Sequence, residues 1–312
     1  MTQGKLSKFF YALFATFFAL QGAPLPALTG DQPRLVATLS ILADWVKNVA
    51  GEDAQVFSLL GPNGDPHQFE PSPSVLRALA SADVVFKIGL GLEPWLESAM
   101  RSSAARAQVI EVSAGVPVIT LSHHEHGEGC LHKHGEFDPH IWQNPRHAAH
   151  AVKRIRDTLV KLFPQKAEIY RRNSDAYIAA LRKLDRELES KFVAIPAERR
   201  VLVTNHHSMG YFAQRYGFRL AGNVLNSPST ETGEPSPMEI ARLAKLIREQ
   251  KIAAIFSENT SGNRLAALVA REAGVPHVEG LLSDALGTTP GTDSYIGMMR
   301  HNAALIVEAL SR

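Results

Sequence analysis

Residues 34–60 read RLVATLSILADWVKNVAGEDAQVFSLL, and this stretch decides the expected fold. The apolar run Leu35–Ile41 is typical of a buried strand. Ala43–Ala50 has helical spacing and ends at Gly51, and Val56–Leu60 is a second apolar run. Because short apolar strands separated by helices are typical of parallel βαβ units, this stretch predicts an α/β fold with parallel sheets.

The same alternation continues along both halves of the chain, with a helical stretch between them. Further apolar strands are expected at residues 84–90, 109–112, 200–204 and 253–257, each beside a helical pattern. No strand pattern occurs over 146–192, where apolar residues recur at helical spacing among charged ones. We therefore predict two parallel-sheet α/β lobes, at 31–165 and 193–312, joined by a single long helix at 166–192. Open parallel sheets bind ligands beyond the carboxyl ends of their strands, so the site is expected in the cleft between the lobes.

The first 27 residues have the layout of a secretory signal peptide. Lys5 and Lys8 precede the apolar run Phe9–Leu20, and small residues and prolines follow. The run has about a dozen residues, whereas a membrane-spanning helix needs roughly 20. We predict a signal peptide at 1–27 and localisation of the mature protein in the periplasm.

Composition narrows the classes of partner. The chain has 33 basic and 31 acidic residues, and loss of Lys5 and Lys8 with the signal peptide leaves them balanced. A near-neutral chain has no electrostatic feature that favours nucleic acid, and we expect a monomer. Cys130 is the only cysteine, so no intrachain disulfide can form. Histidine is the unusual component, with 13 residues.

The tripeptide Asp-Pro-His occurs twice, ending at His67 and at His140. Proline restricts the backbone on either side of it and so sets the approach of the histidine that follows. Asp65 and Asp138 can accept a hydrogen bond from a backbone amide or an imidazole NH, as the partners of metal-bound histidines do. The repeat makes His67 and His140 candidate metal ligands.

Two further segments carry candidate ligands. His206 and His207 follow the predicted strand at 200–204, and Asp284 precedes a loop rich in Thr, Pro and Gly. The residues alone leave alternatives open. One histidine of the pair can cap the next helix, which we favour for His207, and an aspartate such as Asp284 is often a helix cap or a turn residue.

Together these segments resemble the zinc- and manganese-binding periplasmic solute-binding proteins of ABC importers (cluster A-I, also called cluster 9), of the zinc-specific type. The resemblance covers nearly all of the mature chain and rests, in order, on Gly64-Asp65-Pro66-His67-Gln68-Phe69-Glu70-Pro71-Ser72-Pro73-Ser74, on Asp138-Pro139-His140-Ile141-Trp142, on His206 with Gly210-Tyr211-Phe212 and Tyr216-Gly217, and on Ser283-Asp284-Ala285-Leu286-Gly287. It implies two lobes, a rigid linking helix and a metal between the lobes. The ligands it implies are His67, His140, His206 and Asp284, because alignment on Gly210-Tyr211-Phe212 selects His206 over His207.

The implied ligand set favours zinc. Three imidazoles and one carboxylate suit the tetrahedral N/O coordination of Zn²⁺. Manganese prefers more oxygen ligands, and manganese-preferring relatives commonly place glutamate at the position of His206. We predict one tightly bound Zn²⁺, with a manganese or mixed zinc/manganese protein as the alternative.

A histidine-rich loop at 122–135 precedes the second ligand motif. Its histidines are His123, His124, His126, His132 and His134. Zinc-specific members of the family have similar loops. One hypothesis is a weak auxiliary zinc site that delivers metal to the main site, and the other is a solvated insertion that binds metal incidentally. Cys130 is either a further zinc ligand or a free thiol.

The remaining polar residues are assigned roles outside the set of four implied ligands. Glu258, at the carboxyl end of a predicted strand, is a candidate to orient a ligand imidazole. The histidines at 147 and 150 are interpreted as surface residues, and none of His147, His150, His277 and His301 as ligands. The loop that carries Asp284 is expected to order when metal binds.

The sequence thus predicts high-affinity zinc capture and delivery to an ABC transporter permease, with a periplasmic zinc metallochaperone as a further candidate partner. A zinc-dependent hydrolase is the rival class, but a fourth ligand would close the position that catalytic zinc keeps for water. The chain also has no H-E-x-x-H or G-x-S-x-G motif. A surface adhesin would need a tether that the sequence does not show. A metal buffer that acts without a transporter stays open.

Overall fold

The computed structural model describes residues 32–121, 136–225, 235–260 and 262–311. The predicted signal peptide at 1–27 and the histidine-rich loop at 122–135 lie outside these residues. Within the described ranges, no helix combines the length and the apolar character needed to cross a bilayer.

The first lobe is built on a four-stranded parallel sheet with the order β2-β1-β3-β4. The elements are β1 (Arg34–Ala37), α1 (Ser40–Ala50), β2 (Gln55–Ser58), α2 (Pro73–Ala80), β3 (Val84–Lys87), α3 (Leu96–Ser102) and β4 (Gln108–Glu111). Central strand β1 buries Leu35, Val36 and Ala37 completely. The strand predicted over Leu35–Ile41 ends early, because the last residues of that apolar run already belong to the buried face of α1.

The second lobe contains two parallel strand pairs, β5-β6 and β7-β8, with β5 packed beside β7. Its elements are β5 (Val201–Thr204), α6 (Gly210–Tyr216), β6 (Arg219–Asn223), α7 (Pro237–Glu249), β7 (Ile255–Glu258), α8 (Asn263–Ala273), β8 (His277–Leu281) and α9 (Tyr295–Leu310). Val203 and Ile255 are completely buried between the strands and the helices that cover them. Strands β5, β7 and β8 end at or within three residues of a predicted site residue, which is His206, Glu258 and Asp284 respectively.

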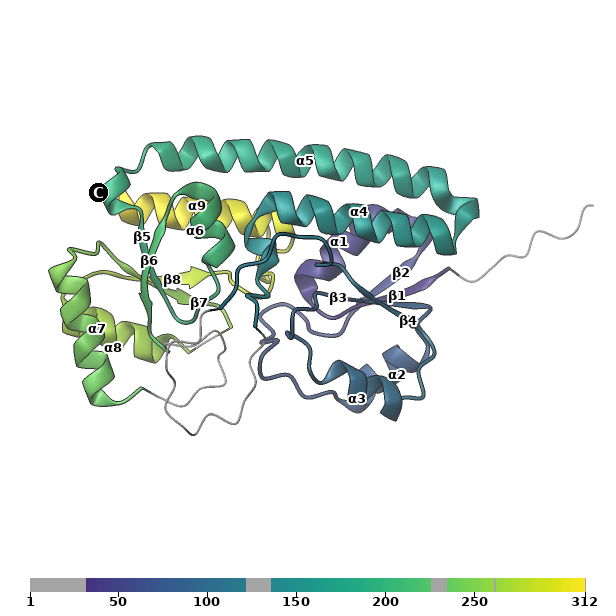
Figure 1. The fold of residues 1–312 in the computed structure, drawn as a ribbon, viewed down its shortest axis with the longest axis horizontal. Helices are drawn as coiled ribbons and strands as arrows, with labels where there is room; N and C mark the ends of the chain where they lie inside the picture. Colours follow the sequence, from purple (N-terminus) through teal and green to yellow (C-terminus); the bar gives the residue numbers. More distant parts are fainter. Residues whose placement is uncertain (1–31, 122–135, 226–234, 261, 312) are drawn as a thin grey trace, which may run out of the picture. The chain divides into compact units, whose positions relative to one another are not determined.

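A long helix, α5 (Ala167–Val193), follows α4 (Pro145–Leu162) and joins the lobes. Figure 1 shows α5 in teal running past α4 at one end and past α9 at the other, and it packs against α1, α4 and α9. On the first lobe, Tyr177 donates a hydrogen bond to Asp44 of α1 at 2.9 Å. At the other end, Phe192 contacts the rings of Phe212 and Phe218. The predicted fold of two parallel-sheet α/β lobes joined by a single long helix is confirmed.

Short 3₁₀ turns complete the described chain: η1 (Gly51–Asp53), η2 (Ile141–Gln143), η3 (Pro164–Lys166) and η4 (Ala197–Arg199). Turn η2 matters most for the site, because it begins directly after His140 and leads into α4. The chain after residue 31 packs together as one compact unit, and the contacts within it do not mark where one lobe ends and the next begins. The lobe boundaries predicted at 165 and 193 therefore stay predictions.

Candidate metal centre

Four side chains from four separate segments meet at one point. His67 lies in the loop between β2 and α2, His140 directly before η2, His206 after β5 and Asp284 after β8. Each offers one ligand atom, and these atoms all lie within 4.8 Å of one another. His140, His206 and Asp284 are buried, whereas His67 is partly exposed. The fold therefore brings all four residues predicted as ligands into a single group able to hold a metal ion.

The imidazole Nε2 atoms converge on the carboxylate of Asp284. Its Oδ2 lies 3.1 Å from Nε2 of His206 and 3.8 Å from Nε2 of His67, and its Oδ1 lies 3.6 Å from Nε2 of His140. The Nε2 atoms of His67 and His140 are 3.4 Å apart. Tetrahedral ligands at roughly 2.0–2.1 Å from a zinc ion are separated by roughly 3.3 Å, so this spacing suits a small ion at the centre.

Both Asp-Pro-His tripeptides fold in the same way. Oδ1 of Asp65 accepts a hydrogen bond from the backbone N–H of His67, and Oδ1 of Asp138 accepts one from that of His140, each at 2.9 Å. These i to i+2 bonds fix the backbone at the histidine. Oδ1 of Asp138 also lies 2.7 Å from Nδ1 of His140, which directs Nε2 of that ring toward the centre.

Glu258 has the corresponding place behind His206. Its Oε2 lies 2.5 Å from Nδ1 of His206, and both side chains are fully buried. Its Oε1 accepts hydrogen bonds from the backbone N–H groups of Asn205 and His206 and from the hydroxyl of Ser208. Glu258 therefore contacts the imidazole of His206, a candidate ligand, whereas the contributions of Asn205 and Ser208 had no recognisable pattern in the sequence.

The electrostatics of the group favour a cation at its centre. Burial alone lowers the pKa of His206, but the adjacent carboxylates of Glu258 and Asp284 outweigh burial and raise this pKa well above its ordinary value. Burial raises the pKa of Asp284, yet the surrounding histidines, above all His206, hold it below its ordinary range. Oδ1 of Asp284 is buried and accepts no hydrogen bond from any described residue. An ionised, buried and incompletely paired carboxylate is a site for positive charge.

Two interpretations from the sequence are wrong. His207 does not cap the next helix, because α6 has Met209 at its N-cap position and no side-chain cap. His147 and His150 are not surface residues: both are partly buried, His147 packs against the ring of Tyr211, and Nε2 of His150 lies 3.1 Å from the carbonyl oxygen of Ala114. Neither these residues nor His277 and His301 belong to the four-residue group.

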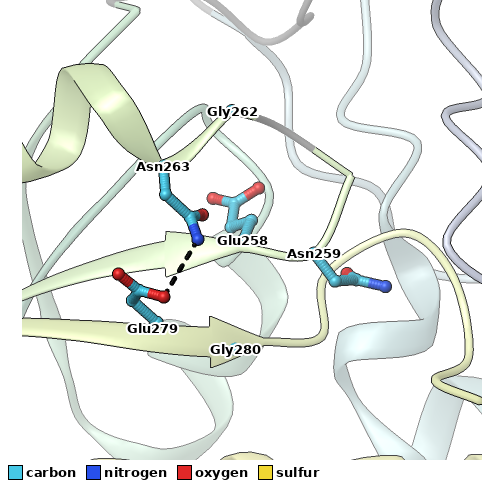
Figure 2. Close-up of a pocket in the computed structure, with 6 residues that line it drawn as sticks. All are labelled: Glu258, Asn259, Gly262, Asn263, Glu279 and Gly280. Atoms are coloured by element: carbon cyan, nitrogen blue, oxygen red, sulfur yellow. Dashed lines mark hydrogen bonds between the residues drawn. The ribbon is translucent and has the colours of Figure 1, made fainter.

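An open hollow of about 480 Å³ adjoins Glu258 (Figure 2). Its other lining residues are Asn259, Gly262, Asn263, Glu279 and Gly280. Across it, Nδ2 of Asn263 donates to Oε2 of Glu279 at 3.2 Å. None of the four converging side chains is among its lining residues, and Glu258 borders both the hollow and the metal centre.

Comparison with known proteins identifies the family of this chain. Residues 35–309 match the family model described as zinc-uptake complex component A, periplasmic, or ZnuA. The chain belongs to the ZnuA family. Members of this family are substrate-binding proteins of ABC transporters and not enzymes, which excludes the hydrolase. The chain is thus a metal-binding component of an ABC importer.

Similar proteins carry names for different metals. The zinc-binding protein TroA of Treponema pallidum is 34% identical over 294 residues, with 92% of this chain and 91% of TroA covered. The manganese-binding lipoprotein MntA of Halalkalibacterium halodurans is 33% identical over 284 residues, with 91% and 90% covered. The iron ABC transporter substrate-binding lipoprotein MtsA of Streptococcus pyogenes is 32% identical over 290 residues, with 90% of each covered. The solved structure of Treponema pallidum TroA superposes with a TM-score of 0.80 at 33% identity and covers 90% of this chain and all of that one.

Proposed function

We propose that this ZnuA-family protein captures one Zn²⁺ in the periplasm and delivers it to the permease of an ABC importer. The ligands are Nε2 of His67, His140 and His206 and the carboxylate of Asp284. The observation that carries the proposal is the convergence of these atoms within 4.8 Å in a largely buried place. Residues 31–165 and 193–312 are proposed as the two lobes that supply two ligands each.

The choice of zinc rests on the chemistry of the ligand set. Three neutral nitrogen donors and one carboxylate give a compact four-coordinate site, the arrangement that Zn²⁺ accepts in tetrahedral geometry. Relatives named for zinc, manganese and iron are about equally similar to this chain, so kinship does not choose among metals. The nitrogen-rich donors therefore carry the argument.

One observation favours manganese as the second candidate. The two oxygens of Asp284 face different histidines, with Oδ2 3.1 Å from His206 and Oδ1 3.6 Å from His140. A carboxylate that used both oxygens would add a fifth donor and raise the oxygen content, which suits Mn²⁺ better than Zn²⁺. Coordination through one oxygen gives the zinc site.

The ligand assignment is tested by competition titration of single alanine variants against a zinc chelator. Replacement of His67, His140, His206 or Asp284 is expected to weaken zinc binding by more than the roughly 100-fold that loss of an outer hydrogen-bond partner can cost. His207→Ala is the matched control, because it removes the neighbouring histidine that lies outside the group. Equal losses in His206→Ala and His207→Ala would contradict the assignment.

A further inference from the structure

Two buried side chains of the first lobe donate to one carbonyl of the second. Nε1 of Trp142 lies 2.6 Å from the carbonyl oxygen of Ser283, and Nε2 of Gln143 lies 2.7 Å from the same oxygen. All three residues are completely buried. A carbonyl oxygen has two lone pairs, so these two donors saturate it.

The position of this contact connects two proposed ligands. Trp142 and Gln143 belong to turn η2, which begins directly after His140, and Ser283 directly precedes Asp284. The flanks of both segments are held as well. Tyr295 donates to the carbonyl of Trp142 at 2.6 Å, and the side chain of Asn302 bonds both the N–H and the carbonyl of Leu282.

We propose that Trp142 and Gln143 are positioning residues that hold Asp284 at the metal through the Ser283 carbonyl. A displacement of Asp284 must break both bonds or drag η2, and with it His140, away from the centre. His140 and Asp284 therefore engage and leave the metal as one unit. This inference rests on the proposed function, in which Asp284 is a metal ligand.

Replacement of Gln143 can remove its hydrogen bond to Ser283 with little other change to the protein. Its Oε1 is buried and has no hydrogen-bond partner among the described residues, so the only polar contact described for this amide is its bond to Ser283. Leucine has a similar volume, removes that bond and also removes the unsatisfied oxygen. Because an unsatisfied buried group is itself destabilising, Gln143→Leu should change the stability of the metal-free protein little.

The test is a double-mutant cycle on zinc affinity. Wild type, Gln143→Leu, Asp284→Ala and the double variant are titrated with zinc against a chelator. Gln143→Leu is expected to raise the dissociation constant about 10- to 100-fold in the wild-type background, as loss of an outer partner does. In the Asp284→Ala background the same change should have an effect of less than about 2-fold, because its target is gone. Trp142→Phe should show the same pattern.

Control and contrary outcomes separate this inference from the proposed function. Tyr177→Phe removes a partly buried hydrogen bond, between α5 and Asp44, and should leave zinc affinity unchanged. Tight zinc binding by the wild type with equal effects of Gln143→Leu in both backgrounds would overturn the positioning role alone. Absence of tight zinc binding in the wild type would overturn the proposed function and this inference with it. Thermal unfolding of each metal-free variant identifies any variant that fails to fold. If Gln143→Leu or Trp142→Phe fails to fold, the zinc affinities of the other variant test the positioning role.

Discussion

Nδ1 of His206 lies 2.5 Å from Oε2 of Glu258, in a place where both side chains are completely buried. When the imidazole is neutral, this contact favours the tautomer with the proton on Nδ1, in which Nε2 can bind a metal. The other oxygen of Glu258 is fixed by Asn205 and Ser208, so the carboxylate itself cannot rotate away. His206 is thus oriented from the interior of the second lobe.

Glu258→Gln tests this orientation. The amide keeps the size of the side chain but removes the charge that fixes the imidazole tautomer. Zinc affinity should fall about 10- to 100-fold, measured by chelator competition. Glu279→Gln is the control, because Glu279 lines the neighbouring hollow and its described contacts are with Asn263 and His277, not with the four candidate ligands. Equal affinities for wild type and Glu258→Gln would contradict the orienting role.

Gly210 is expected to be essential to the position of His140. A Cβ atom on Gly210 would lie 2.5 Å from Oδ2 of Asp138, the carboxylate that contacts Nδ1 of His140. Gly210→Ala should therefore displace Asp138 and weaken zinc binding about 10-fold or more, although alanine favours the helix that starts here. A Cβ on Gly61 meets nothing within 4 Å, so Gly61→Ala should bind zinc as the wild type does. Unchanged affinity of Gly210→Ala would show that the site tolerates this displacement.

Asp185 is predicted to stabilise the fold without affecting the metal. From α5 it accepts two hydrogen bonds from Arg215 of α6, at 2.7 and 2.8 Å, and one from Arg146 of α4 at 2.9 Å. Asp185→Asn should lower the free energy of unfolding by about 2–3 kcal/mol, the contribution of hydrogen bonds to charged groups. Asp175, on the same helix, forms an exposed pair with Arg156, and Asp175→Asn should cost less than about 0.5 kcal/mol. Urea denaturation measures both, and similar losses in the two variants would contradict the argument.

His147 should make the metal-free protein less stable in acid. Burial, assisted by nearby His150, lowers the pKa of His147 to about 4 from an ordinary value of 6.5. The folded state therefore binds this proton less readily than the unfolded chain. The contribution of neutral His147 to the free energy of unfolding is fully present above pH 6.5 and is lost as the pH falls from 6.5 toward 4.

The measurement is urea unfolding of wild type and His147→Phe across this pH range. The variant cannot be protonated, and phenylalanine can keep the contact with Tyr211. As the pH falls, its free energy of unfolding should fall less steeply than that of the wild type. The difference in slope should correspond to up to about one proton fewer taken up on unfolding. Parallel pH dependences for the two proteins would mean that His147 does not contribute to acid sensitivity.

The parts of this protein that sequence reasoning predicted are those set by local patterns. The alternation of strands and helices and the apolar spacing of α5 gave the fold class, although the end of β1 was placed at Ile41 instead of Ala37. An apolar run that continues from a strand into a buried helix face has no internal boundary in hydrophobicity alone. Similarly, the two Asp-Pro-His tripeptides are short-range structures, so His67 and His140 could be recognised as candidates from the repeat, and the family resemblance then implied them as ligands.

The long-range part of the site had no such local pattern. His206 and Asp284 were identified through resemblance to a family, because an isolated aspartate before a loop reads as a turn residue. The bonds from Trp142 and Gln143 to Ser283 join residues 141 and 140 positions apart. No periodicity or motif encodes a contact of that separation, and only the folded arrangement reveals it.

The most direct test of zinc capture is a competition between metals. The mature protein, stripped of metal, is offered Zn²⁺ and Mn²⁺ together, and the metal that stays bound after removal of loose ions is counted. We predict one zinc per chain and no retained manganese, because three imidazoles and one carboxylate prefer zinc. One retained manganese per chain in the presence of zinc would contradict the account and assign the protein to manganese uptake.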